Sequence, residues 1–340
     1  DHRDLHSFPT RRSSDLITRD LVIVGGGPAG MAAALSAHRH GIEDILLIER
    51  DQHLGGILNQ CIHPGFGLDY FKEILTGPEY AHKVTNELHS IPAIEISLRS
   101  FVVKLTKNKI LTLLKPGTLE QIEARALIMA TGCREKTREM IQIPGTRPAG
   151  IFSAGLAQKL MNIEGLLPGK NIVVVGSGDI GLIMARRLTL EGAEVKAVIE
   201  IQNQSRGLIR NVVQCLEDFN IPLYLNHKIT RIYGNKRAEK VDVAKVDNQF
   251  NVIANSQFSI ECDTILISVG LIPENELIEM AGIPIDPKTN GPASTELNKT
   301  PIPGLFVCGN SFKVYDLADS VSRDSELAGE LAAQYLRGKP

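Results

Sequence analysis

The hydrophobic positions of this chain form short apolar runs, several of which end in glycines or in an acidic residue. The run 21–24 leads into the sequence GGGPAG, and an alanine-rich stretch follows from Met31 to His40. A second run, 45–48, ends in Glu49. Apolar runs of this length that alternate with a helical stretch predict the buried parallel strands of a doubly wound sheet.

The same order of elements occurs a second time. An apolar run at 171–175 leads into GSGDIG, a helix is expected over 182–190, and the run 195–199 ends in Glu200. In both copies the acid lies nineteen residues after the last glycine of the motif. The repeat predicts two Rossmann-like dinucleotide-binding units in one chain.

Other segments show short apolar runs separated by turn residues, which predict β-meanders. These strands are expected at 94–96, 101–103, 110–114, 126–129, 223–228, 231–233, 241–246 and 250–254. The segment 70–88 is expected to form two helices separated by Gly77-Pro78, and the last helix is expected over about 320–336. The predicted fold class is therefore α/β, with two Rossmann-like dinucleotide-binding domains and β-meander insertions.

Each glycine motif has the spacing G-x-G-x-x-G. The first glycine permits a tight turn, the second lets the backbone approach a pyrophosphate, and the third lets helix and strand pack closely. The N–H groups and the positive end of the helix favour phosphates. The acid can accept hydrogen bonds from ribose hydroxyls. A glycine-rich surface turn is the alternative, and the strand, glycines, helix, strand and acid in register count against it.

Glu200 bears on the choice of nicotinamide nucleotide. A carboxylate at this position accepts a hydrogen bond from a free 2′-hydroxyl and repels a 2′-phosphate. Arg206, six residues later, is the argument for NADP(H), because an arginine can bind a 2′-phosphate. The sequence favours NAD(H), with NADP(H) as the alternative.

Composition excludes several classes of function. The 340 residues carry 37 basic and 39 acidic side chains, a net charge of -2, which gives no basic field for nucleic acid. No apolar run approaches the length of a membrane span. None of the five cysteines forms a C-x-x-C pair, so no metal site or local disulfide is expected. A sparse, odd number of cysteines is typical of a cytoplasmic protein.

The beginning of the chain does not belong to this pattern. SFPTRRSSDL, residues 7–16, reads like the translation of a sequencing-adapter oligonucleotide. It lacks the apolar centre of a signal peptide. Residues 1–16 are therefore expected to be a non-native, disordered leader, with the native start near Ile17.

A glycine-rich loop after Glu49, GGILNQCIHPG, contains two candidates for chemistry. Cys61 is either a thiolate that faces a cofactor or a small buried side chain, since its reactivity depends on a lowered pKa. His63 is either a general base for an amine or alcohol substrate or a structural histidine. The remaining cysteines, 133, 215, 262 and 308, are expected to pack in the core.

Together these motifs resemble the flavin-dependent pyridine nucleotide-disulfide oxidoreductase superfamily, in its short thioredoxin-reductase-like form. GGGPAG with Glu49 resembles the FAD fingerprint, and GSGDIG with Glu200 resembles the NAD fingerprint. ATG at 130–132 and SVG at 268–270 resemble the two crossover strands, and 305–310 resembles the second FAD motif. That motif usually ends in aspartate, where this chain has Asn310.

The resemblance implies FAD and NAD(H) as cofactors and a discontinuous FAD-binding domain, 17–145 plus 267–340, around an NAD-binding domain, 146–266. It also implies that the start of the last helix, near Asp319 to Ser322, points at the flavin. The cofactor-binding residues expected from these motifs are Gly25, Gly27, Pro28, Ala29, Gly30, Glu49, Arg50, Gly56, Ala130, Thr131, Gly132, Gly176, Gly178, Asp179, Ile180, Gly181, Glu200, Gly270, Gly309, Asn310 and Ser322.

The chain departs from the disulfide-reducing members of this superfamily. Residues 146–266 lack the C-x-x-C of thioredoxin reductases, and Cys61 stands alone where glutathione-reductase-like members have two cysteines. LGGILNQCIH, ATGCRE and SVGLIPENEL resemble a bacterial group associated with anaerobic glycerol 3-phosphate dehydrogenase systems. That group is similar to subunits of amino-acid-oxidising complexes such as sarcosine oxidase and hydrogen cyanide synthase.

The expected function is that of an FAD-dependent NAD(P)H oxidoreductase. It would transfer hydride between NAD(H) and FAD and pass electrons to or from a redox partner protein or a small organic substrate. The expected partner is a glycerol-3-phosphate-dehydrogenase-like or cysteine-rich subunit of a hetero-oligomer. The alternatives are a flavin-dependent dehydrogenase subunit for amine or hydroxy substrates and a non-catalytic flavin-binding scaffold subunit.

Overall fold

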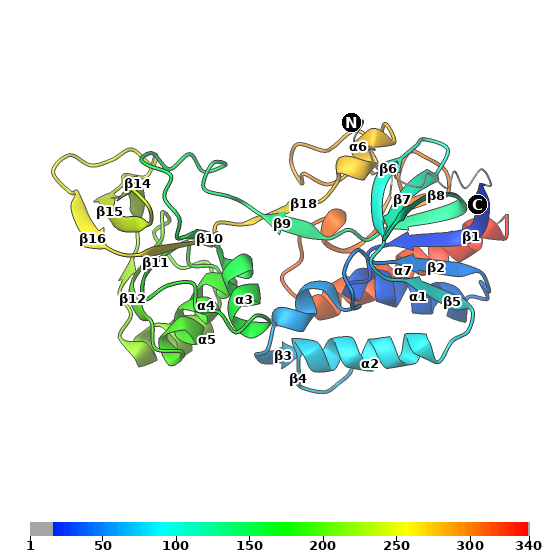
Figure 1. Ribbon diagram of the computed structural model, residues 1–340, viewed down its shortest axis with the longest axis horizontal. Helices are drawn as coiled ribbons and strands as arrows, with labels where there is room; N and C mark the ends of the chain where they lie inside the picture. Colours follow the sequence, from blue (N-terminus) through cyan, green and yellow to red (C-terminus); the bar gives the residue numbers. More distant parts are fainter. Residues whose placement is uncertain (1–15, 295, 339–340) are drawn as a thin grey trace, which may run out of the picture. The chain divides into compact units, whose positions relative to one another are not determined.

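The computed structural model describes residues 16–338, with the exception of residue 295. The expected leader, apart from Leu16, lies outside the described residues. The chain divides into two compact units: unit 1 is formed by the chain up to Arg134 and from Pro273 onwards, and unit 2 by Glu135–Ile272 (Figure 1). The strands β9 (Cys133–Glu135) and β18 (Leu271–Pro273) lie at these boundaries and pair with each other. The units therefore separate at this pair of strands, whereas the sequence placed the boundaries at 145/146 and 266/267.

Unit 1 contains a sheet with the strand order β5-β2-β1-β8-β7-β6, and β19 also pairs with β8. Its strands are β1 (Ile17–Val24), β2 (Ile45–Ile48), β5 (Ile94–Ser97), β6 (Phe101–Leu105), β7 (Ile110–Lys115), β8 (Thr118–Met129) and β19 (Leu305–Val307). β8 runs parallel to β1 and β19 and antiparallel to β7. The expected meander therefore continues the parallel sheet through one long strand.

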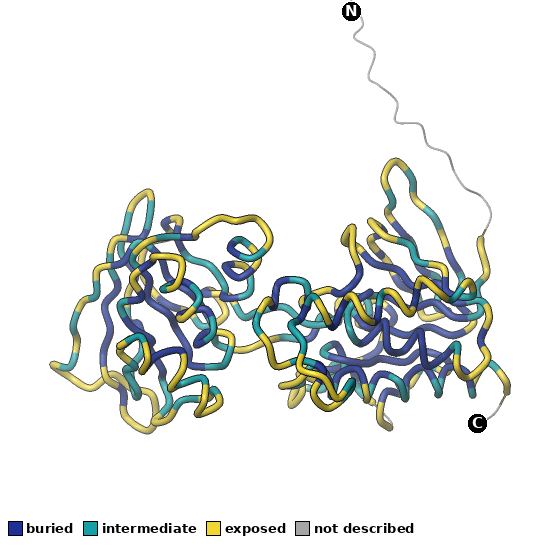
Figure 2. Tube along the Cα trace, turned by 90° about the horizontal axis from the view of Figure 1, so that it is seen from below, coloured by how far each residue is buried: buried dark blue, intermediate teal, exposed yellow. Residues whose placement is uncertain are grey.

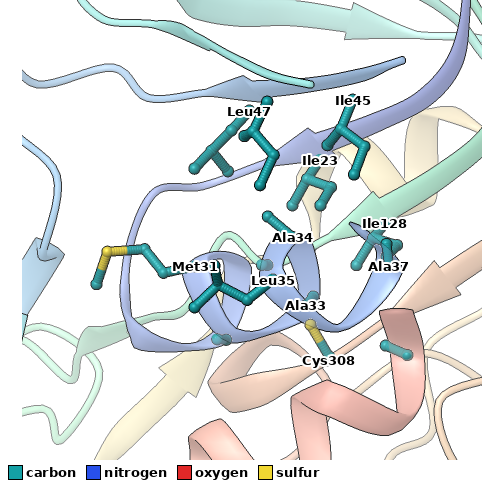
Figure 3. Close-up of a cluster of buried hydrophobic side chains, with 14 of the residues drawn as sticks. Ile23, Met31, Ala33, Ala34, Leu35, Ala37, Ile45, Leu47, Ile128 and Cys308 are labelled. Carbon is teal, nitrogen blue, oxygen red and sulfur yellow. The ribbon is translucent and has the colours of Figure 1, made fainter. Parts of the chain in front are cut away.

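The two faces of this sheet are covered by different elements. Leu21 and Ile23 pack with α1 (Pro28–Arg39), α2 (Gly77–His89) and α7 (Ala318–Leu336), whereas Val22 and Val24 pack with the meander and α6 (Glu276–Met280). Figure 3 shows the small side chains of α1 in the first of these clusters. A Cβ on Gly329 would lie 2.3 Å from the Ala33 carbonyl oxygen, so α1 and α7 pack backbone against backbone.

Unit 2 has a fully parallel sheet with the order β10-β17-β11-β12-β13. Its strands are β10 (Ile151–Ser153), β11 (Asn171–Val175), β12 (Glu194–Ile199), β13 (Leu223–Tyr224) and β17 (Thr264–Ile267), and its helices are α3 (Ala154–Asn162), α4 (Asp179–Leu190), α5 (Ile209–Cys215) and η2 (Glu217–Phe219). Ile172 and Val174 pack on one face and Val173 and Val175 on the other. In both units the central strands are buried (Figure 2).

A three-stranded antiparallel sheet completes unit 2, formed by β14 (His227–Gly234), β15 (Ala238–Lys245) and β16 (Phe258–Glu261). The buried Asp242 on β15 accepts hydrogen bonds from Ser259 Oγ at 2.6 Å, Tyr233 OH at 2.7 Å and Gln257 Nε2 at 3.0 Å. The hydrogen bond from Ser259 is the main cause that lowers the pKa of Asp242.

Three sequence predictions of secondary structure are wrong. The strand expected at 223–228 is broken at 225–226, where β13 ends and β14 begins in another sheet. Residues 70–74 are not helical, and the single helix α2 begins at Gly77 because Thr76 caps it. Thr76 Oγ1 accepts from Glu79 N–H, while the Glu79 carboxylate accepts from Thr76 N–H, which forms a capping box. The strand expected at 250–254 is irregular apart from an isolated bridge between Val246 and Val252, because Asp247 accepts hydrogen bonds from the backbone at 249 and 251, and β16 begins only at Phe258.

The remaining elements are η1 (Gly56–Gln60), β3 (Pro64–Phe66), β4 (Leu75–Thr76) and η3 (Gly309–Ser311). Within residues 16–338, residue 295 excepted, no helix has both the length and the apolar character that a bilayer crossing needs.

Candidate nucleotide-binding sites

The first glycine motif lies between β1 and α1 in unit 1. Gly25 has φ of 111°, and a Cβ there would lie 2.3 Å from the Ala130 carbonyl oxygen. A Cβ on Gly30 would lie 1.8 Å from the Gly25 carbonyl oxygen. A Cβ on Gly27 would meet nothing within 4 Å. Gly25 and Gly30 are therefore required by the fold itself, whereas Gly27 faces open space at the start of α1, where a phosphate group fits.

Glu49 is buried at the end of β2, 6% exposed. Its Oε2 accepts a hydrogen bond from Gly26 N–H at 2.7 Å, and its Oε1 accepts one from Asp51 N–H at 2.8 Å. A carboxylate has about four acceptor positions, so each oxygen can accept one more hydrogen bond. The two ribose hydroxyls of a dinucleotide match these two positions.

The loop that follows Glu49 returns to the glycine motif. Gly55 N–H donates to the Gly26 carbonyl oxygen at 2.8 Å, and a Cβ on Gly56 would lie 3.2 Å from Gly27 Cα. Arg50 is exposed at the start of this loop. The loop thus borders the open space beside Gly27, and any larger residue at Gly56 would narrow it.

Two further predicted segments of unit 1 lie close to this motif. Ala130 N–H donates to the Val24 carbonyl oxygen at 2.8 Å, so the ATG sequence begins beside β1. Thr131 Oγ1 donates to the Glu274 carbonyl oxygen at 2.7 Å. Gly309 has φ of 64°, and a Cβ there would lie 2.5 Å from Ala29 Cβ. The structure therefore brings the ATG segment to Gly25 and Gly309 to Ala29, the residue after Pro28 in the first turn of α1.

Asn310 is fixed by contacts with its own chain. Its Oδ1 accepts a hydrogen bond from Tyr315 N–H at 3.0 Å, and its Nδ2 donates to Cys133 Sγ at 3.5 Å. An aspartate at this position would have no hydrogen to donate to the sulfur. The family motif usually has aspartate at this position. The amide of Asn310 can instead donate a hydrogen bond to the neighbouring Cys133 sulfur.

The start of α7 carries a buried carboxylate whose contacts the sequence did not predict. Asp319, 6% exposed, accepts hydrogen bonds from the backbone N–H groups of Gly67 at 2.8 Å, Asp69 at 2.7 Å and Tyr70 at 3.2 Å. Ser322, 1% exposed, accepts a hydrogen bond from Tyr80 OH at 2.8 Å. Asp319 thus fastens the 67–70 loop to α7, and the Ser322 hydroxyl lies in the contact between α2 and α7.

Cys61 and His63 follow η1 in the same loop of unit 1. Cys61 is buried, and its carbonyl oxygen accepts from Gly77 N–H at 2.9 Å. His63 Nδ1 lies 3.1 Å from the Pro64 carbonyl oxygen, so Nδ1 carries a proton. Within the described residues, the buried His63 Nε2 has no hydrogen-bond partner. In this tautomer Nε2 is the hydrogen-bond acceptor of the ring.

Three other cysteines are buried thiols. Burial raises the pKa of Cys262 and of Cys308 to about 12, and it raises the pKa of Cys215 above its ordinary value. A thiol with a raised pKa is a poor nucleophile at neutral pH. This supports the prediction that these three side chains serve packing.

The second glycine motif, between β11 and α4 in unit 2, repeats the geometry of the first. A Cβ on Gly176 would lie 2.0 Å from the Ser268 carbonyl oxygen, and one on Gly181 would lie 2.9 Å from the Gly176 carbonyl oxygen. A Cβ on Gly178 would meet nothing within 4 Å. Ser268 begins the SVG sequence, which ends at Gly270, so this sequence contacts the second motif as ATG contacts the first.

Glu200 is buried at the end of β12, 3% exposed, and accepts three hydrogen bonds. Its Oε2 accepts from Ser177 N–H at 2.9 Å and from Ser177 Oγ at 2.6 Å, while its Oε1 accepts from Gln202 N–H at 2.9 Å. Sequence reasoning missed Ser177. A signal existed, because this residue stands where the first motif has Gly26.

Two other predicted residues begin α4. The Asp179 carboxylate accepts from Leu208 N–H at 2.8 Å and from Asn211 Nδ2 at 2.7 Å, so it holds the segment after Glu200. Ile180 is 37% exposed. Each motif thus combines a buried acid, a backbone cradle and open space at its middle glycine, which fits one dinucleotide in each unit.

Comparison with known proteins agrees with this geometry. The sequence pattern of the pyridine nucleotide-disulphide oxidoreductases matches residues 19–324. The HcnB subunit of the hydrogen cyanide synthase of Pseudomonas protegens is 29% identical over 77% of this chain and 58% of its own length. One of the subunits of the opine oxidase of Agrobacterium tumefaciens is 23% identical over 92% of this chain and 64% of its own length.

The fold has also been seen in solved structures. The thioredoxin reductase of Lactococcus lactis superposes with a TM-score of 0.75 at 22% identity, covering 94% of this chain and 99% of that one. The chain spans about three-fifths of the length of the two curated relatives that are named as subunits.

Proposed function

The chain belongs to the pyridine nucleotide-disulphide oxidoreductase family, and we propose that it transfers hydride between NAD(H) and FAD and exchanges electrons with a partner protein. Members of this family are FAD-dependent oxidoreductases that use NAD(P)H. The observation that carries the proposal is the repeated site geometry: Glu49 and Glu200 are both buried, and both accept backbone hydrogen bonds beside a glycine motif.

We assign FAD to unit 1 and NAD(H) to unit 2. In unit 1, Glu49 would accept the ribose hydroxyls, and the backbone at Gly27 would admit the pyrophosphate. In unit 2, Glu200 would accept a ribose hydroxyl, and Gly178 would admit the pyrophosphate. When bound, FAD supplies a two-electron carrier between the nicotinamide and the final acceptor. The Glu200 charge disfavours a 2′-phosphate, which supports NAD(H) over NADP(H).

The distribution of cysteines supports the proposal that a partner protein exchanges electrons with the flavin. The sequence contains no C-x-x-C, and three of its five cysteines are buried with raised pKa values. Two relatives are named as subunits of larger enzymes. We propose a glycerol-3-phosphate-dehydrogenase-like or cysteine-rich partner. We place the reaction in the cytoplasm, where isolated thiols stay reduced.

Anaerobic titration of the purified flavoprotein tests this proposal. NADH should bleach the flavin absorbance faster than NADPH, and Glu200→Ala should narrow that difference because the charge that repels the 2′-phosphate is gone. Glu194→Ala, at the exposed start of the same strand, is the matched control and should leave the difference unchanged. A protein that binds no FAD on reconstitution, or whose flavin neither nucleotide reduces, would refute the proposal.

A second candidate function is oxidation of an amine or hydroxy substrate at the flavin, with His63 as the base. The observation that favours it is the His63 Nε2 atom, which is buried and has no partner among the described residues. The relative from Agrobacterium tumefaciens is named as part of an opine oxidase, which agrees with this reaction. Anaerobic bleaching of the flavin by an amine or hydroxy acid, lost in His63→Gln, would support it. Bleaching by NADH alone would reject it.

A further inference from the structure

Ser177 forms hydrogen bonds with both the buried acid of the second nucleotide site and the loop that follows this acid. Its side chain is fully buried, its Oγ donates to Glu200 Oε2 at 2.6 Å, and the same Oγ accepts from Arg206 N–H at 3.1 Å. Its carbonyl oxygen accepts from Gly207 N–H at 2.8 Å and from Ser205 Oγ at 3.2 Å. One residue therefore holds both the acid of the site and the loop that follows it.

The first site provides a comparison within the same molecule. The Glu49 carboxylate and the loop after it make the same backbone contacts with Gly26 that Glu200 and its loop make with Ser177. Gly26 has no side chain, and a Cβ there would lie 2.4 Å from a Leu54 methyl group. The hydroxyl of Ser177 is therefore an addition to a cradle that forms without it.

This hydroxyl changes how many hydrogen bonds the acid can still accept. Glu200 Oε2 already accepts from two donors of Ser177, whereas Oε1 accepts from Gln202 N–H alone. With about four acceptor positions on a carboxylate, Glu200 retains one, on Oε1, whereas Glu49 retains two. Glu200 can thus take a single ribose hydroxyl, in an orientation that Ser177 fixes.

The same hydroxyl holds the backbone of the one basic residue in this loop. Arg206 is the only lysine or arginine between Glu200 and Gly207, and its side chain is exposed. Arg206 would favour a 2′-phosphate and Glu200 would oppose it, so their relative positions decide the balance. Ser177 bonds to both residues, which fixes the backbone from which the Arg206 side chain extends.

We propose that Ser177 determines nucleotide specificity in the second site. Its hydroxyl holds the Glu200 carboxylate toward a free 2′-hydroxyl and keeps the Arg206 backbone in place, so that the site selects NAD(H) and rejects NADP(H). The inference rests on the proposed function, since it takes unit 2 as the nicotinamide nucleotide site. Without the hydroxyl, the loop around Arg206 loses one attachment and the guanidinium can approach a 2′-phosphate.

The test is calorimetric binding to the FAD-loaded protein, with ADP-ribose and 2′-phospho-ADP-ribose as probes. Neither probe carries a nicotinamide, so binding is measured without flavin reduction. We expect Ser177→Ala to lower the preference for ADP-ribose by about tenfold, which corresponds to the loss of one charge-assisted hydrogen bond. Ser177→Gly restores the residue type of the first site and should show the same shift, which guards against a folding defect in either variant.

Two controls distinguish a specific role of the Ser177 hydroxyl from a general loosening of the loop after Glu200. Ser205→Ala removes a hydroxyl of the same loop that binds only the backbone of Ser177 and Gly207, so the preference should remain that of the wild type. Adding Arg206→Ala to Ser177→Ala should restore part of the preference, because the released cation is gone while the hydrogen bond to Glu200 is still missing.

The possible outcomes distinguish an error about Ser177 from an error about the nucleotide site itself. A wild-type protein that binds ADP-ribose, with a preference unchanged in both Ser177 variants, overturns this inference and leaves the proposed function intact. An equal shift in Ser205→Ala also overturns the inference. A wild-type protein that binds neither probe overturns the proposed nucleotide site and the inference with it.

Discussion

Gly27→Ala should weaken the binding of FAD without lowering the stability of unit 1. Gly27 has φ of -76° and ψ of -174°, a conformation open to any residue, and a Cβ there meets nothing within 4 Å. The variant is therefore expected to fold as the wild type does. The added methyl group would occupy the space through which a pyrophosphate approaches the start of α1.

The size of the effect follows from the hydrogen bonds that the methyl group would displace. A hydrogen bond from a backbone N–H to a charged group contributes about 1.5–3 kcal/mol, so losing one raises the dissociation constant of FAD about 10- to 150-fold. Gly30→Ala is the contrasting variant. Its Cβ would lie 1.8 Å from the Gly25 carbonyl oxygen, so the turn itself must move and the flavin-free protein must lose stability.

Fluorescence titration of the flavin-free protein with FAD measures the affinity, and thermal unfolding of the same preparation measures the stability. Gly27→Ala should lose affinity at an unchanged melting temperature, whereas Gly30→Ala should lose both. Wild-type affinity for FAD in Gly27→Ala would refute the reasoning, since it would place the pyrophosphate elsewhere. A melting temperature that falls equally in both variants would show that Gly27, too, serves the fold.

Three further outcomes are expected. Asp242→Asn should destabilise the protein by about 1–3 kcal/mol at neutral pH, because a carboxylate that accepts three hydrogen bonds is lost. The lowered pKa of Asp242 stabilises the fold above the ordinary value of 3.8 and stops doing so as the pH falls through the folded pKa, so denaturation curves of variant and wild type should converge in acid. Asp319→Ala should speed hydrogen exchange at the Gly67 and Asp69 amides without global unfolding, and unchanged protection would show that other contacts hold this loop. Cys61→Ser should abolish a long-wavelength charge-transfer band of the oxidised flavin, and an unaltered spectrum and rate would assign Cys61 to packing.

The parts of both sites that the sequence predicted are those set by local sterics. Gly25 and Gly176 need positive φ and a close backbone approach, and only glycine provides both. An acid at the end of the next strand reaches the same turn because parallel neighbouring strands end at one edge of the sheet. The first glycine and the acid lie 24 residues apart in both copies, Gly25 to Glu49 and Gly176 to Glu200, so a pattern of glycines, apolar runs and an acid records this relation.

The parts that the sequence did not predict depend on partners far away in the chain. Asp319 binds backbone groups some 250 residues before it, and these groups carry no sequence signal because every residue has an N–H. The hydrogen bond from Tyr80 OH to the Ser322 hydroxyl joins residues 242 positions apart and likewise carried no sequence signal. The start of α2 at Gly77 was missed for a local reason. Gly77-Pro78 was interpreted as a break between two helices, whereas the capping box of Thr76 and Glu79 makes it the first turn of a single helix.

The two sites differ in one side chain beside the buried acid, and we attribute the nucleotide selectivity of the second site to it. Their backbones make the same contacts with the buried acid, so the cradle alone cannot distinguish one adenosine ribose from another. The difference lies in one side chain, the Ser177 hydroxyl, which takes an acceptor position from Glu200 and adds an attachment for the loop that carries Arg206. In unit 1, a Cβ at Gly26 would lie 2.4 Å from a Leu54 methyl group, so a side chain there would require Leu54 to shift. On this inference the residue between the first two glycines sets the orientation of the acid toward the ribose, although the spacing of glycines and acid is the same in both motifs.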